Sequence, residues 1–128
     1  MKIVALETSA VTASAAVTED ERLLAQSFQN SGLTHSATLM PMVADLLKNT
    51  GLSLDQMDVV AVAAGPGSFT GVRIGVAAAK GLAWPGDKPC APCSTLESMA
   101  WQCAHVGGGI CAAMDARREQ VYCARFWA

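Results

Sequence analysis

The segment Gly65–Gly71, with the sequence Gly-Pro-Gly-Ser-Phe-Thr-Gly, carries the strongest chemical signal in the chain. It follows an apolar run and precedes a helical pattern, so it predicts a glycine-rich turn before a helix N-terminus. The N–H groups of such a turn and the positive end of the helix can bind an anion such as phosphate. The spacing is neither the G-x-G-x-x-G of dinucleotide-binding folds nor a P-loop. The alternative is that the glycines only allow a strand and a helix to pack closely.

Polar residues at the ends of two other apolar runs could complete a phosphate site. Glu7, Thr8 and Ser9 follow the first run, and Asp115 ends a later one. One hypothesis is therefore a nucleotide-binding enzyme, whose phosphates would be lined by Glu7, Thr8, Ser9, Gly67, Ser68, Thr70 and Asp115. We expect no resident cofactor in the chain, and under this hypothesis ATP or ADP would bind at the interface with a partner.

The five cysteines could carry redox or metal chemistry. Their number is odd and no secretion signal precedes them, which argues against a disulfide framework. Cys90 and Cys93 form a CxxC motif, as in thiol oxidoreductases, and with Cys103 and His105 they could hold zinc. However, the pair lies in a segment typical of a short buried strand, and the spacing matches no common zinc finger. We therefore expect reduced cysteines that pack as small buried hydrophobes, and no bound metal.

Composition and charge exclude several classes of protein. The chain has 128 residues, of which 52% are hydrophobic and 16% charged, and this predicts one folded domain rather than disorder. Its formal net charge is −2, so we expect no direct binding of nucleic acid. No apolar run reaches the roughly 18 residues of a membrane span, and no signal peptide is evident. The predicted location is the cytoplasm.

Hydrophobic periodicity predicts the elements that position these residues. In chain order they are strands at 2–6, 12–18 and 22–29, a helix at 35–48, a strand at 58–64, a helix at 70–83, a strand at 88–93 and a helix at 95–103. Thr34 or Ser36 is the predicted N-cap of the first helix. Ser94 is the predicted N-cap of the last helix, because Glu97 follows three residues later as in a capping box.

The order of these elements predicts the fold class. Three antiparallel strands followed by parallel ones make a mixed α/β sheet flanked by helices, which is the plan of a ribonuclease-H-like lobe of the actin-like ATPase fold. A further hairpin, at 110–115 and 120–127, repeats the opening pattern of a strand that ends in an acid, a turn and a second strand. We therefore divide the chain into a ribonuclease-H-like lobe, 1–106, and the first hairpin of a truncated second lobe, 107–128.

A stripe of small residues marks the helix at 70–83. Gly71, Gly75 and Ala79 recur every four residues, so either a second helix or the chain's own sheet can approach closely. The helix is apolar almost all round, which favours burial on two sides and hence a partner. The residues expected to bind that partner, on this helix and on the one before it, are Leu39, Met40, Val43, Gly71, Val72, Gly75, Val76 and Ala79.

Five blocks of sequence, taken in order, resemble the YeaZ (TsaB) family of bacterial proteins. The most specific is Gly65–Gly75, which reads GPGSFTGVRIG. The resemblance covers the whole chain but only the N-terminal part of the family's longer sequence. The other four blocks are Ile3–Ser9, His35–Pro41, Ser94–Glu97 and Asp115–Tyr122.

The resemblance implies a role in tRNA modification. It implies a non-catalytic subunit that binds the TsaD transferase while threonylcarbamoyladenosine (t6A) is made in tRNAs that read codons starting with A. The implied partners are a TsaD-like paralogue and a TsaE-like ATPase, and alone the chain would form a homodimer. Such proteins carry a glycoprotease-like label without having enzyme activity of their own.

The resemblance also allows a test for the catalytic metal of TsaD, which a His-x-x-x-His helix holds. When Glu97 is aligned with the acid of that motif, Thr95 and Met99 occupy the two histidine positions. Neither side chain is a useful metal ligand there, which argues against a metal. Similar proteins carry Asp where this chain has Glu7, and the longer side chain displaces the carboxylate in a way that disfavours an octahedral Mg²⁺ shell.

Overall fold

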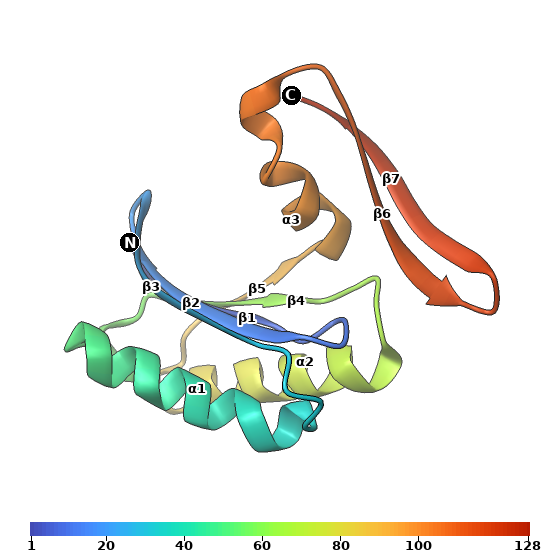
Figure 1. Cartoon of the computed structure of the whole chain (residues 1–128). Helices are drawn as coiled ribbons and strands as arrows, with labels where there is room; N and C mark the ends of the chain where they lie inside the picture. The colour runs from blue at the N-terminus through green and yellow to red at the C-terminus, as the bar shows by residue number, and fades with distance from the viewer.

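The structure, a computed structural model, describes residues 1–128. Five strands form one mixed sheet in the order β3-β2-β1-β4-β5, two helices cover one face of it, and a separate hairpin, β6-β7, lies at the C-terminal end of the chain (Figure 1). The strands are β1 (Lys2–Glu7), β2 (Ala13–Glu19), β3 (Arg22–Gln29), β4 (Val59–Ala63), β5 (Cys90–Cys93), β6 (Gly109–Arg117) and β7 (Gln120–Trp127). The helices are α1 (His35–Thr50), α2 (Phe69–Ala83) and α3 (Thr95–Trp101), with 3₁₀ turns η1 (Leu54–Gln56), η2 (Trp84–Gly86) and η3 (Ala104–Val106).

Strand β1 lies at the centre of the sheet and joins its two halves. It runs antiparallel to β2 and parallel to β4. Beyond these neighbours, β3 is antiparallel to β2, and β5 is parallel to β4. The predicted mixed sheet is therefore confirmed, and every predicted strand and helix is present with ends that differ by a few residues.

The main hydrophobic core lies between the sheet and the two helices α1 and α2. Val4 and Leu6 of β1 alternate with outward-facing residues and are almost fully buried on the helix side. Leu39 and Val43 of α1, one helical turn apart, meet them from the other layer. One cluster of 15 buried side chains joins these elements, so the helices and the sheet form a single packed unit.

The opposite face of the sheet carries small and polar side chains. Ala5 and Glu7 of β1, Ala16 of β2 and Ala61 of β4 lie on it and are partly exposed. Neither α1 nor α2 covers this face (Figure 1). It is bordered instead by residues of α3 and by Met114 of β6, which leaves an open cleft above the sheet.

Helix α3 packs against the hairpin. Leu96 and Ala100 of α3 form a second small core with Ala112 of β6. The turn into β6 contains Gly107 and Gly108, whose φ angles of 77° and 85° favour glycine. The boundary predicted at residue 107 falls at this turn, although α3, which precedes it, shares its buried side chains with the hairpin that follows.

One of the two predicted helix caps makes its side-chain hydrogen bond, and the other does not. Ser94 Oγ accepts a hydrogen bond from the Glu97 N–H at 3.2 Å, which is the N-cap half of the predicted capping box. Thr34, one of the two residues predicted to cap α1, is its N-cap residue, but its side chain makes no capping hydrogen bond. The first turn of α1 is held instead by His35 Nε2, which lies 2.7 Å from the carbonyl oxygen of Ala10.

The prediction of buried cysteines is wrong, because all five are exposed. β5 is an edge strand of only four residues, so Cys90 and Cys93 have few neighbours to cover them. Residues three apart on a strand face opposite sides of the sheet. Cys90 Sγ lies 3.6 Å from the carbonyl oxygen of Ala79 in α2, whereas Cys93 lines the cleft on the other face. This geometry argues against a Cys90–Cys93 disulfide.

Candidate functional site

The glycine-rich segment packs against the chain's own backbone at the end of β1. A Cβ atom added at Gly71 would lie 2.1 Å from the carbonyl oxygen of Thr8, and one at Gly67 would lie 2.5 Å from that of Ser9. Thr8 Oγ1 donates to the Gly71 carbonyl oxygen at 2.7 Å and is fully buried. These glycines therefore allow the end of β1 to lie directly on the start of α2.

Part of the hydrogen-bonding capacity of this segment is used within the chain. The Ser68 N–H donates to the Ser9 carbonyl oxygen at 2.7 Å. Ser68 Oγ in turn accepts from the Gly71 N–H at 3.2 Å, which caps α2. On the other side of the segment, the Thr95 N–H donates to the Gly65 carbonyl oxygen at 2.9 Å. The segment thus connects β1, α2 and α3.

The seven residues predicted to line phosphates occupy different environments. Thr8 and Ser9 are buried under α2, while Ser68 and Thr70 are exposed at its start. Asp115 lies on the separate hairpin, where its carboxylate accepts from the Arg117 N–H at 2.7 Å. Only Glu7 and Ser9 of the seven line the cleft above the sheet. Phosphate binding at the segment stays a prediction.

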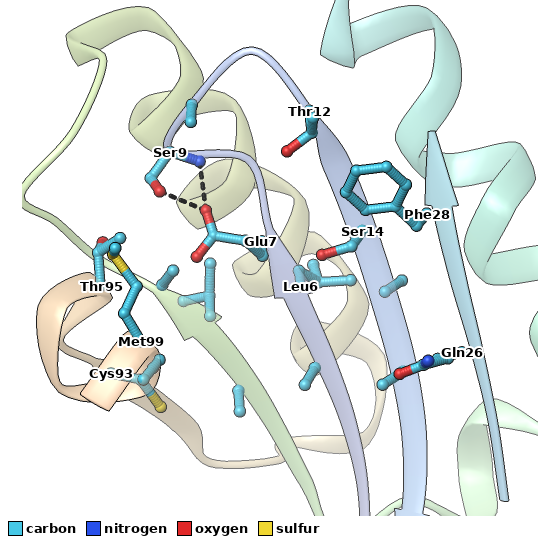
Figure 2. Close-up of a pocket in the computed structure, with 18 of the residues that line it drawn as sticks. Leu6, Glu7, Ser9, Thr12, Ser14, Gln26, Phe28, Cys93, Thr95 and Met99 are labelled. Atoms are coloured by element: carbon cyan, nitrogen blue, oxygen red, sulfur yellow. Dashed lines mark hydrogen bonds between the residues drawn. The ribbon is translucent and has the colours of Figure 1, made fainter. Parts of the chain in front are cut away.

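That cleft has a volume of about 650 Å³ and lies on the face of the sheet opposite α1 and α2. Figure 2 shows the Glu7 side chain extending from β1 toward the Thr95–Met99 stretch of α3. One oxygen of the Glu7 carboxylate accepts from the Ser9 N–H at 2.6 Å and also from the Ser9 hydroxyl. Small alanines form the floor, and hydroxyl and amide side chains line much of the wall.

The two residues aligned with the TsaD metal ligands lie in this same cleft. Thr95 and Met99 line it together with Glu7 (Figure 2). The chain holds no cluster of three or more His, Cys, Asp or Glu side chains that could bind a metal ion. Cys90, Cys93, Cys103 and His105, the set weighed as zinc ligands, therefore do not come together in one cluster.

The predicted partner-binding residues divide into two groups. Five of them are buried inside this chain: Leu39, Val43, Gly71, Gly75 and Ala79. Their assignment as partner contacts is corrected, because the small-residue stripe of α2 faces Thr8 and Val62 of the chain's own sheet. Met40, Val72 and Val76 are at least partly exposed.

Sequence reasoning missed Phe69, which exposes 76% of its surface at the start of α2. Its ring lies under the Arg73 guanidinium, 5.2 Å from the centroid, in a cation–π contact. The i, i+4 spacing of an aromatic residue and an arginine on a predicted helix is the signal that could have found this pair.

Comparison with known proteins identifies the family. The family model described as "TsaD: tRNA N6-adenosine threonylcarbamoyltransferase" matches residues 14–127. A Bacillus subtilis protein named "tRNA threonylcarbamoyladenosine biosynthesis protein TsaB" is 40% identical over 122 residues, which cover 95% of this chain and 53% of that protein. The TsaB protein of Escherichia coli K12 is 38% identical over 128 residues, 98% of this chain and 55% of that protein.

The chain belongs to the TsaB (YeaZ) branch of the TsaD family. A solved structure, YeaZ from Pseudomonas aeruginosa, superposes with a TM-score of 0.92 at 32% identity and covers 99% of this chain and 60% of that one. The predicted fold class, with its ribonuclease-H-like sheet, is thereby confirmed. The chain spans about half the length of the curated TsaB relatives. None of its helices has both the length and the hydropathy needed to cross a membrane.

Proposed function

We propose that this chain is a non-catalytic partner subunit in tRNA threonylcarbamoyladenosine (t6A) biosynthesis, and that it binds a TsaD-type transferase through the outer faces of α1 and α2. The TsaB relatives are named for this biosynthesis, which supports the pathway. A TsaE-like ATPase would join the complex. Without the transferase, two copies of the chain would pair through the same surface.

The observation that carries the proposal is the exposure of apolar side chains on two neighbouring helices. Met40 of α1 exposes 45% of its surface and Phe69 of α2 exposes 76%. Val72 and Val76, on the same helix as Phe69, are partly exposed. Both helices cover one face of the sheet, so their outer sides form the solvent boundary of the molecule there (Figure 1). Apolar side chains exposed on two neighbouring helices favour a protein interface there.

The cleft supports a binding role rather than a catalytic one. When Glu97 is aligned with the acid of the TsaD metal motif, Thr95 and Met99 take the two histidine positions, and a threonine hydroxyl and a thioether are poor substitutes for imidazole. The formal net charge of −2 favours contact with tRNA through the partner rather than through this chain. All these steps belong in the cytoplasm.

The test is complex formation with the TsaD-type transferase of the same source, measured by size-exclusion chromatography with light scattering. Met40→Glu puts a charge on the outer face of α1, and we expect loss of the complex. Val106→Glu is the matched control, since Val106 exposes 72% of its surface in η3, away from both helices (Figure 1). A complex that survives Met40→Glu, or one that Val106→Glu disrupts equally, would contradict the proposal.

A further inference from the structure

Strand β3 forms one edge of the sheet and carries few of the features that normally protect an edge. It ends the order β3-β2-β1-β4-β5, so the N–H and C=O groups on its outer side meet no neighbouring strand. The eight residues of β3 include no proline and no lysine, and Arg22 is their only charge. The opposite edge, β5, has four residues, one of which is Pro92. Short length and proline hinder strand addition at β5, whereas β3 is open to it.

A bulge in β3 decides which of its side chains share a face. β3 pairs with β2 through a register shift that leaves Leu24 as the extra residue. Beyond the shift, Leu23 pairs with Thr18, and Thr18 follows Val17, which is fully buried on the helix side of the sheet. Since neighbouring residues of a strand face opposite sides, Thr18 and Leu23 lie on the open face, opposite α1 and α2. Leu23 exposes 51% of its surface.

Three exposed side chains of β3 are evenly spaced on this open face. Gln26 and Phe28 lie two residues apart and both line the cleft there (Figure 2). Leu23 lies three residues before Gln26, but the bulge takes up one of the three, so both apolar side chains are equally far from Gln26 along the strand. Phe28 exposes 67% of its surface. A polar centre flanked evenly by two apolar side chains is self-complementary.

Two copies of β3, paired antiparallel, bring these side chains together. A two-fold axis through Gln26 places the two copies of Gln26 opposite each other, where their amides can exchange hydrogen bonds. Each Phe28 then lies opposite Leu23 of the other copy. On the helix side, Arg22 lies opposite Gln29 of the other copy, so no like charges meet. Cross-strand pairs of an aromatic and an aliphatic side chain stabilise a sheet, and like charges directly opposite each other destabilise it.

Helix α1 leaves room for the second copy. The two-fold axis stands perpendicular to the sheet, so the two α1 helices lie on the same face of the joined sheet. α1 contacts both β2 and β3. With strands about 4.8 Å apart, each α1 therefore lies about 5–7 Å from the axis, and the two helices lie about 10–14 Å apart. Packed helices approach to about 8–10 Å, so the two copies do not clash there.

We propose that β3 pairs with β3 of a second copy of this chain, in the antiparallel register centred on Gln26, and so joins two five-stranded sheets into one. This surface is the edge of the sheet, whereas the proposed transferase surface is the outer faces of α1 and α2 (Figure 1). Pairing through β3 therefore does not require the transferase, and both surfaces can be occupied at once.

The test measures self-association of the full chain by sedimentation velocity, at low salt and up to millimolar concentration. Every sample carries Met40→Glu, which removes the other proposed pairing surface, so a failure of one proposal can be told from a failure of the other. The chain with β3 unchanged should form dimers. Gln26→Lys puts two like charges opposite each other on the axis, and Gln26→Glu does the same, so each should weaken the dimer at least fivefold. Gln120→Lys, at an exposed position of β7, is the matched control and should leave the dimer within twofold.

An equal mixture of the Gln26→Lys and Gln26→Glu chains gives the decisive readout. Opposite charges then face each other across the axis, so the mixture should dimerise at least as tightly as the chain with β3 unchanged. Gln26 is exposed, so each variant should keep the same far-UV circular dichroism spectrum. The proposal is overturned if Gln26→Lys dimerises undiminished or if the mixture stays monomeric. A chain that stays monomeric with β3 unchanged would leave the edge to an extended segment of another protein, and would overturn it as well.

Discussion

A single added methyl group tests whether the glycines of α2 serve the chain's own sheet. In Gly71→Ala the new Cβ would lie 2.1 Å from the Thr8 carbonyl oxygen, which belongs to the backbone and cannot rotate away. Gly81→Ala is the matched control on the same helix, because a Cβ there meets nothing within 4 Å. The two variants add the same atoms to the same element, and only their surroundings differ.

The expected free energies of unfolding follow from these distances. Overpacking costs about 1–3 kcal/mol. Displacement of Gly71 also weakens the 2.7 Å hydrogen bond from Thr8 Oγ1 to its carbonyl oxygen, a further loss of about 1 kcal/mol. Alanine regains up to about 1 kcal/mol of helix propensity at either position. We therefore expect Gly71→Ala to destabilise the chain by about 2 kcal/mol, whereas Gly81→Ala stabilises it by about 0.5 kcal/mol.

Urea unfolding, monitored by far-UV circular dichroism, measures both changes in the free energy of unfolding. In thermal melts the melting temperature should shift by about 3–4 °C for each kcal/mol in a chain of this size. If Gly71→Ala leaves the urea unfolding midpoint unchanged, the close packing of β1 against α2 is refuted. The stripe of small residues would then be free to serve a partner, as the sequence alone had allowed.

Three further outcomes follow from the structure. Ser94→Ala removes the N-cap of α3 and should cost about 1 kcal/mol in urea unfolding. Mild oxidation should produce no Cys90–Cys93 disulfide by mass spectrometry, because the side chains face opposite sides of β5. The Met1 ammonium donates to the Asp20 carboxylate, which raises the pKa of the amino terminus and lowers the pKa of that carboxyl. The contribution of this pair to the free energy of unfolding should be present above the ordinary carboxyl pKa of 3.8 and be lost as pH falls through the lowered pKa of Asp20. At alkaline pH the contribution should be lost as pH rises through the raised pKa of the Met1 amino group. An NMR titration of both groups checks the two directions.

The fold was largely predictable because each element obeys a local rule. The partial alternation along β2 and the continuous apolar run of β4 indicate the antiparallel and parallel parts of the sheet. The capping-box sequence Ser94–Glu97 predicts the start of α3 correctly, because Ser94 is its N-cap residue. These local patterns do not show which strands lie next to each other in the sheet. The cysteines of β5 were expected to be buried, but edge position, which depends on strand order, leaves them exposed.

The sites show the same division between local and long-range information. The glycines at 67, 71 and 75 were identified from the sequence, but their purpose depends on Thr8 and Ser9, some 60 positions away, which lie against them only in the folded chain. The cleft could be anticipated only in part. Alignment with the metal helix of TsaD indicated Thr95 and Met99, whereas the lack of a basic lining residue required the three-dimensional structure.

The most direct test of the proposed partner role is methyl NMR of the chain with ¹³C-labelled methionines, recorded as the TsaD-type transferase of the same source is added. Met40 lies on the outer side of α1, and Met99 and Met114 line the cleft on the opposite face of the sheet. Binding through α1 and α2 predicts that the Met40 methyl signal shifts or broadens, while those of Met99 and Met114 stay in place. An unchanged Met40 signal in a formed complex, with changes confined to Met99 and Met114, would contradict the account.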